Sequence, residues 1–146
     1  MKDAWWKEAV VYQVYPRSFM DANGDGIGDI KGIMSKLDYI KSLGVDAIWF
    51  SPLYKSPQED MGYDIADYKD IAEEYGTLDE LKELLEAIHA RGMKVILDGV
   101  FNHCGSFNKW LDRECIYENA EGYEKGAYVS EDSPCLLYTS PSPRDS

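Results

Sequence analysis

Three short apolar runs alternate with two amphipathic helical segments, and this order constrains the fold more than any other feature of the sequence. The runs cover residues 9–15, 45–50 and 93–98 and are rich in β-branched and aromatic side chains, so each is predicted to be a buried strand. Apolar strands separated by helices are typical of a parallel sheet covered by helices. Two architectures meet that description, the doubly wound sheet and the (β/α)8 barrel.

The two helical segments are defined by apolar residues at helical spacing and by signals at their ends. In the first segment apolar side chains recur over residues 30–43, and Gly44 is expected to end the helix. The second segment begins with Thr77 as the N-cap and Glu80 three residues later, which is the pattern of a capping box, and it ends at Gly92. The side chains predicted to form its buried face are Leu78, Leu81, Leu85 and Ile88.

Polar side chains after the predicted strands favour the barrel. Barrel active sites are built from the loops at the carboxyl ends of the strands, although doubly wound sheets bind ligands there too. Residues 24–28 match neither GxGxxG nor Walker A, and the carboxylates of the loop that contains them, residues 21–29, would repel phosphate. A barrel needs roughly 250 residues, so this chain would supply its first β/α units. The polar residues expected at this edge are Arg17, Ser51, Asp60, Asp98 and His103, of which Asp60 lies in a long predicted loop, residues 53–76.

The β/α alternation stops at Cys104 and thereby suggests three parts. Residues 1–103 are assigned to the N-terminal part of the barrel. Residues 104–133 are polar and aromatic, with a weak helical pattern near residues 107–118, and are interpreted as irregular or as the start of an inserted domain. Residues 134–146 shift abruptly to serine and proline and are interpreted as a non-native tail, with a disordered terminus as the alternative.

Composition narrows the classes of partner. Fifteen Lys plus Arg against 27 Asp plus Glu give a net charge of −12, which argues against binding to nucleic acid or to anionic membranes. A hydrophobic content of 45% predicts a packed core rather than a disordered chain. No apolar run approaches the roughly 20 residues of a membrane span, and the first residues lack the apolar segment of a signal peptide. Three cysteines without CxxC spacing favour a reducing cytoplasm.

Residues 21–29 place side-chain oxygens at alternate positions in a glycine-containing loop. A hard cation such as Ca²⁺ takes about six to eight oxygen ligands, and glycines allow a short loop to wrap around it. The first six residues match the EF-hand pattern, but Gly32 stands where that pattern has its last glutamate, and a strand rather than a helix precedes the loop. Three carboxylates this close repel one another, so a bound cation is favoured over an Asx-rich turn without metal.

Two further motifs have the chemistry to contact a sugar. Residues 98–103 contain a carboxylate that can orient a cationic partner and an imidazole that can donate to a hydroxyl. The alternative is a strand-end Asp that caps the next turn beside a surface His. Residues 60–68 combine carboxylates with tyrosines, whose faces stack on sugar rings. Taken alone, that segment is equally described as an acidic loop with tyrosines packed into the core.

Together these motifs resemble the α-amylase superfamily of glycoside hydrolases and are most similar to its oligo-1,6-glucosidase and α-glucosidase branch. Four segments stand in the order and spacing of that family, namely residues 11–19, 21–29, 62–65 and 98–103. The resemblance implies a (β/α)8 barrel with a domain inserted after the third strand. It also implies retaining hydrolysis of α-glucosidic bonds in oligosaccharides, by an Asp nucleophile and a Glu acid/base about 5 Å apart. Both would come from later strands, so no catalytic residue is assigned here and the chain alone is expected to be inactive.

The resemblance implies binding roles for individual residues. Tyr63 would stack on the sugar that precedes the scissile bond, and His103 would bond its 6-hydroxyl. Asp60 would pair with an Arg from outside this chain, and Asp98 would hold the Arg that precedes the nucleophile. Met61, where the branch usually has Asn, leaves the linkage specificity open, as does the likeness of residues 99–105 to the neopullulanase branch. A structural Ca²⁺ or Mg²⁺ would be bound by Asp21, Asn23, Asp25, Asp29 and the Ile27 carbonyl.

Two other classes of protein compete with the glycosidase. One is a non-catalytic, cation-dependent carbohydrate-binding homologue of the same fold. The other is a small α/β domain like a response regulator, whose acidic cluster would also bind a divalent cation. The second is disfavoured because the acidic residues form one contiguous loop after the first strand. The expected partner is an α-linked gluco-oligosaccharide and the expected location is the cytoplasm, while the oligomeric state is not predicted.

Overall fold

The computed structural model describes residues 3–111, which fall into two compact units. The first unit contains the residues up to Leu53 together with Ile71–Asp98. The second contains Tyr54–Asp70 and the described residues from Gly99 onward. Residues 112–146 lie outside the described part, so most of the predicted inserted domain and the whole predicted tail are not addressed by it.

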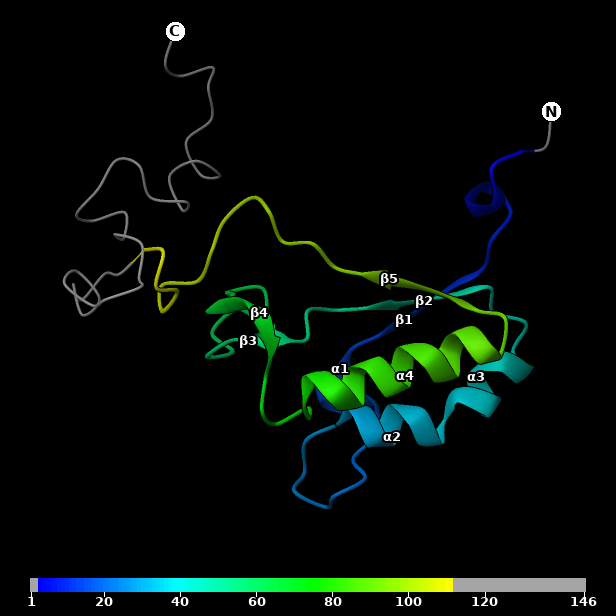
Figure 1. Ribbon diagram of the computed structural model, residues 1–146, viewed down its shortest axis with the longest axis horizontal. Helices are drawn as coiled ribbons and strands as arrows, with labels where there is room; N and C mark the ends of the chain where they lie inside the picture. The colour runs from blue at the N-terminus through cyan, green and yellow to red at the C-terminus, as the bar shows by residue number, and fades with distance from the viewer. Residues whose placement is uncertain (1–2, 112–146) are drawn as a thin grey trace, which may run out of the picture. The chain divides into compact units, whose positions relative to one another are not determined.

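A parallel three-stranded sheet forms the frame of the first unit (Figure 1). Its strands are β1 (Val11–Val14), β2 (Ala47–Phe50) and β5 (Lys94–Leu97), in the order β1-β2-β5. Both pairings are parallel, with Val14 opposite Phe50 and Phe50 opposite Leu97. All three predicted strands are therefore confirmed, each a little shorter than its apolar run.

The helices of the first unit lie together on one side of this sheet (Figure 1). They are α2 (Ile30–Ser35), α3 (Leu37–Ser42) and α4 (Leu78–Ala90), and the short α1 (Pro16–Phe19) and the 3-10 helix η1 (Trp5–Lys7) precede them along the chain. The prediction of one helix over residues 30–43 is wrong, since the segment forms two helices, α2 and α3. They are separated at Lys36, where the backbone leaves the α-helical region (φ −108°, ψ 4°). Gly44 ends α3 with a φ of 78°, as predicted.

Helix α4 begins and ends where predicted, but its buried side chains differ in part from those predicted. The Thr77 side chain accepts a hydrogen bond of 3.2 Å from the Glu80 amide, and Gly92 follows the helix with a φ of 75°. The buried side chains are Leu81, Leu84 and Ile88. Leu78 is 42% exposed, because it is the first residue of the helix and faces away from the core. Leu84 is buried although the pattern did not include it, and the predicted Leu85 is only partly buried.

The core lies between the helices and the sheet face that carries Val14, Ile48 and Phe50, all with no exposed surface. The prediction that the first and third strands are buried throughout is wrong. Val11 is 45% exposed and Ile96 38% exposed. The register places both on the face opposite Val14 and Ile48, and the described helices pack against only one face of the sheet.

The second unit contains two short strands that the sequence pattern missed. β3 (Tyr54–Lys55) and β4 (Asp67–Ile71) form a two-stranded sheet inside the predicted long loop. The Lys55 ammonium and the Asp70 carboxylate form an ion pair of 2.9 Å between these strands. Charged side chains alternate with tyrosines here, so no apolar run marks the strands. No helix within residues 3–111 is long and apolar enough to cross a membrane.

Candidate functional site

The loop between α1 and α2 is held by its own carboxylates. Asp21 Oδ1 accepts a hydrogen bond of 2.7 Å from the Gly24 amide, and Asp21 Oδ2 accepts one of 2.8 Å from the Gly26 amide. The bond from Gly26 lowers the pKa of the Asp21 carboxyl below its ordinary value, since desolvation only partly opposes it and the Gly24 bond adds to it. Asp21 is therefore an anion at neutral pH.

Two exposed side chains continue the same pattern along the loop. Asn23 Oδ1 accepts from the Asp25 amide at 3.1 Å, and Asp25 Oδ1 accepts from the Ile27 amide at 2.8 Å. The Asn23 amide group also donates to Asp25 Oδ2 at 3.3 Å. An ionised carboxylate has about four lone-pair sites, so the Asp21 and Asp25 oxygens keep acceptor capacity beyond these bonds.

Asp29 is the N-cap of α2 and is only 5% exposed. Its Oδ1 accepts from the Gly32 amide at 2.7 Å, and its Oδ2 accepts from the Ala22 and Asn23 amides at 3.0 and 3.3 Å. This carboxylate therefore connects the start of the loop to the start of the helix. The capping role explains its position without a metal.

The loop fits a hard cation by the chemistry of its donors. Every predicted ligand atom is an oxygen, which Ca²⁺ and Mg²⁺ prefer. The residues that would supply these oxygens are Asp21, Asn23, Asp25, Asp29 and Ile27. Within residues 3–111, however, no three Asp, Glu, His or Cys side chains are gathered closely enough to hold a metal ion. Backbone amides organise this loop in the structure, and Asp21, Asn23 and Asp25 are the side chains with most acceptor capacity left for a cation.

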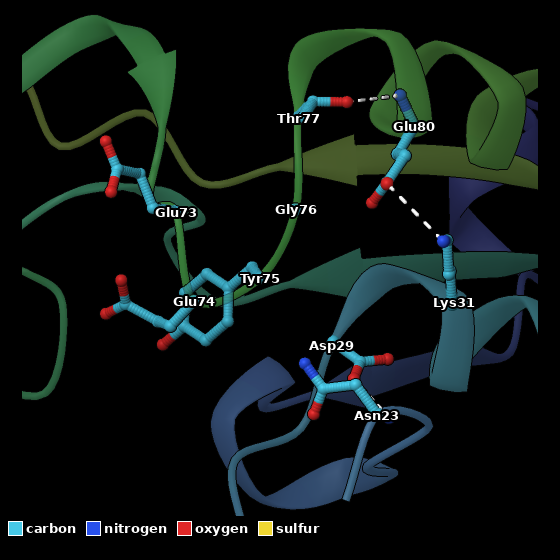
Figure 2. Close-up of a pocket in the computed structure, with 9 residues that line it drawn as sticks. All are labelled: Asn23, Asp29, Lys31, Glu73, Glu74, Tyr75, Gly76, Thr77 and Glu80. Atoms are coloured by element: carbon cyan, nitrogen blue, oxygen red, sulfur yellow. Dashed lines mark hydrogen bonds and ion pairs between the residues drawn. The ribbon is translucent and has the colours of Figure 1, made fainter. Parts of the chain in front are cut away.

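A cavity of about 320 Å³ adjoins the loop in the first unit (Figure 2). Lys31 and Glu80 face each other across part of it, with their charged atoms 3.8 Å apart. Tyr75 is 1% exposed, and burial, aided by the Glu74 carboxylate, raises the pKa of its phenol. No sequence motif predicted this pocket, although three of its acidic lining residues, Glu73, Glu74 and Glu80, lie within four residues of the Thr77 cap. Its lining residues are Asn23, Asp29, Lys31, Glu73, Glu74, Tyr75, Gly76, Thr77 and Glu80.

In the second unit, contacts through main-chain groups connect three of the four predicted sugar-binding residues. His103 Nε2 lies 3.0 Å from the Tyr63 carbonyl oxygen, and the Tyr63 amide donates to the Asp60 carbonyl at 3.0 Å. The Tyr68 hydroxyl lies within hydrogen-bond distance of the carbonyl oxygens of Val100 and His103. The backbone around His103 is therefore fixed against β4, beside the turn that carries Asp60 and Tyr63.

The remaining residues of the predicted edge belong to the first unit. Arg17 lies in α1 directly after β1, Ser51 follows β2 and Asp98 follows β5. Ser51 is buried and its hydroxyl accepts a hydrogen bond of 3.2 Å from the Gln13 side chain. Because the three strands are parallel, these residues share the carboxyl edge of the sheet, as predicted. Asp60 and His103, by contrast, stand several residues beyond β3 and β5 in the second unit.

Met61 adopts a φ of 53°, which bulky side chains rarely do. We expect Met61→Asn to raise the free energy of unfolding by about 0.5–1 kcal/mol, because Asn tolerates the left-handed region better. Urea denaturation measures the change. Leu43→Asn is the matched control, since Leu43 is 49% exposed with an ordinary φ of −76° and should show no gain. An equal response of the two variants would contradict the expectation.

The parallel β/α units define an α/β protein, and comparison with known proteins identifies its architecture. The family model "Alpha amylase, catalytic domain" matches residues 13–134. This chain belongs to that family, whose fold is the (β/α)8 barrel. The assignment confirms the resemblance seen in the sequence motifs.

Relatives and solved structures agree with the assignment. The chain is 60% identical over 111 residues to the oligo-1,6-glucosidase of Parageobacillus thermoglucosidasius, which covers 76% of the chain and 20% of that protein. Trehalose-6-phosphate hydrolase of Bacillus licheniformis is 58% identical with a TM-score of 0.72, covering 74% of this chain and 20% of that one. The trehalulose synthase MutB from Pseudomonas mesoacidophila is 53% identical with a TM-score of 0.74, covering 75% and 20%. The chain thus spans about a fifth of the length of these relatives.

Proposed function

We propose that this chain is part of a retaining glycoside hydrolase that acts on α-glucosidic bonds of short gluco-oligosaccharides, with α-1,6 linkages as its first substrate class. The observation that supports the proposal is the chain of contacts from Asp60 through the Tyr63 backbone to the His103 imidazole, in a chain that belongs to the α-amylase family. The names of its relatives support the linkage, since the similar P. thermoglucosidasius protein is an oligo-1,6-glucosidase.

In the proposed mechanism this chain binds and orients the sugar. The Tyr63 ring stacks on the glucose face, the His103 imidazole binds a sugar hydroxyl, and the Asp60 carboxylate accepts hydrogen bonds from sugar hydroxyls. Asp98, at the carboxyl edge of the sheet, holds a cationic side chain beside the nucleophile. The nucleophile and the acid/base come from strands outside this chain, and an inserted domain begins after residue 103.

A structural Ca²⁺ or Mg²⁺ belongs to the same proposal. Asp21, Asn23, Asp25 and the Ile27 carbonyl would hold it, with Asp29 as a ligand that also caps α2. When bound, the cation offsets the repulsion among the loop carboxylates and takes no part in the sugar chemistry. The loop residues themselves fix how α1 connects to α2, and so the position of β1.

The proposal is tested in a chimera in which the 111 matching residues of this chain replace their counterparts in the P. thermoglucosidasius oligo-1,6-glucosidase. The chimera is expected to release glucose from isomaltose. His103→Ala should lower kcat/KM about tenfold, the usual loss for one hydrogen bond to a substrate hydroxyl. The matched control is His89→Ala, which replaces the only other histidine, exposed on α4.

Two outcomes would overturn the proposed function. One is a folded chimera that binds isomaltose without cleaving it, which would favour the non-catalytic carbohydrate-binding homologue. The other is an equal response of the His103 and His89 variants. The 146-residue chain on its own should release no p-nitrophenol from the α-glucoside above a buffer blank, because removing both catalytic carboxylates costs many orders of magnitude in rate.

A further inference from the structure

Asp64 is a buried carboxylate at the end of the turn that carries Asp60 and Tyr63, and it is 8% exposed. Its Oδ1 accepts hydrogen bonds from the Ser56 hydroxyl at 2.8 Å and from the Asp60 amide at 3.1 Å. Its Oδ2 accepts from the Glu59 amide at 3.0 Å. One side chain therefore closes the whole turn from residue 56 to residue 64.

The turn needs such an anchor because its own backbone is unfavourable. Gln58 and Met61 adopt φ values of 63° and 53°, and a left-handed conformation costs a side chain other than glycine about 1–2 kcal/mol. The Gln58 side-chain amide is also buried without a hydrogen-bond partner among the described residues. Strained positions of this kind persist where surrounding contacts determine them. Here those contacts converge on Asp64.

The anchored turn is linked directly to the residues proposed to bind sugar. The Glu59 and Asp60 amides that bond to Asp64 are the backbone that presents the Asp60 carboxylate. The Tyr63 carbonyl lies 3.0 Å from His103 Nε2, so the same turn also contacts the imidazole. On the other side, the Ile65 carbonyl accepts from the Gly105 amide at 2.9 Å and the Asn108 side chain at 3.0 Å.

We propose that Asp64 is a positioning residue: its carboxylate sets the relative placement of Asp60, Tyr63 and His103 and so determines how tightly these three residues hold a glucosyl unit. This inference rests on the proposed glycosidase function for the sugar, and on the hydrogen bonds of this chain for the positioning itself. Burial raises the pKa of Asp64, and the bonds from Ser56, Asp60 and Glu59 outweigh it, so its pKa lies below the ordinary value. The carboxylate is consequently charged at neutral pH, when hydrogen bonds from amides are strongest.

The first test measures the positioning without any activity. Hydrogen exchange of the amides of residues 58–61, followed by mass spectrometry in the 146-residue chain and in the chimera, should become at least about tenfold faster in Asp64→Asn. Asp67→Asn is the matched control, because that carboxylate accepts only a local bond of 2.8 Å from Lys69 among the bonds described. If Asp64→Asn misfolds, Ser56→Ala removes one donor and should give a smaller increase in the same peptide. Unchanged exchange in both variants overturns the inference.

The second test separates positioning from a general structural role. In the chimera, Asp64→Asn should raise the KM for isomaltose about tenfold and lower kcat only slightly, as expected when uniform binding is lost. In Asp60→Asn, the further change Asp64→Asn should raise KM by much less than tenfold, because the residue it positions has already lost its charge. Additive effects, or a KM unchanged in Asp64→Asn, overturn the inference. An inactive parent chimera overturns the proposed function instead, and hydrogen exchange then decides the role of Asp64.

Discussion

Gly28→Ala is expected to lower the free energy of unfolding by about 3 kcal/mol or more, the upper range for overpacking a closed site. Gly28 is buried where the loop returns to α1, and its amide donates to the Arg17 carbonyl at 2.7 Å. A Cβ at this position would overlap the Pro16 carbonyl oxygen and lie 3.1 Å from the Arg17 carbonyl carbon. Both neighbours are backbone, so neither can rotate away. Calorimetry of the chimera should show a large drop in melting temperature.

Gly24→Ala is the control within the same loop. A Cβ there meets nothing within 4 Å, but its φ of 80° still disfavours alanine. It should cost about 1 kcal/mol, from backbone conformation alone. If Gly24→Ala destabilised the chimera as much as Gly28→Ala, close packing of the loop against α1 would not be the reason for the glycine.

The main elements of the fold could be predicted because each strand and helix carries its own local pattern. Apolar runs marked β1, β2 and β5, and the Thr77 cap marked the start of α4. The break at Lys36 could not be predicted, because the spacing of apolar residues does not show where the backbone leaves the α-helical region. The strands β3 and β4 were not predicted, because they consist mainly of charged and aromatic residues and show no apolar alternation.

The candidate site could be predicted in its residue types but not in its hydrogen bonds. The resemblance implied that Tyr63 and His103 contact the same sugar, and in the structure His103 Nε2 lies 3.0 Å from the Tyr63 carbonyl oxygen. The role of Asp64 depends on the donors Ser56 and Glu59, which approach it only once the turn has formed. The reason why Gly32 replaces the last glutamate of the EF-hand pattern also depends on contacts that the sequence does not show. A Cβ there would overlap the Met20 carbonyl oxygen, so a glutamate has no room at that position.

Removing the proposed cation should lower the melting temperature of the chimera more than it lowers the turnover of the enzyme that remains folded. A ligand that binds only the folded state stabilises it by RT ln(1 + [L]/Kd), about 2.7 kcal/mol at a hundredfold excess over Kd. The Asp21 and Asp25 carboxylates repel each other without a cation, and only amide bonds offset that repulsion. Addition of EDTA followed by calorimetry measures the loss, and elemental analysis of the untreated protein identifies the metal.

Two variants separate a cation in this loop from one elsewhere. Asp25→Ala should abolish the sensitivity to EDTA, because Asp25 Oδ1 has one backbone bond and its other oxygen only a contact of 3.3 Å to Asn23. Asp60→Ala should weaken isomaltose binding and leave the sensitivity intact, since Asp60 belongs to the second unit. Asp29→Asn should lower the melting temperature even in EDTA, because the Gly32 amide would lose a charged acceptor at the N-cap of α2. A melting temperature that EDTA leaves unchanged, with no metal by elemental analysis, would mean that backbone amides alone balance the charges of this loop.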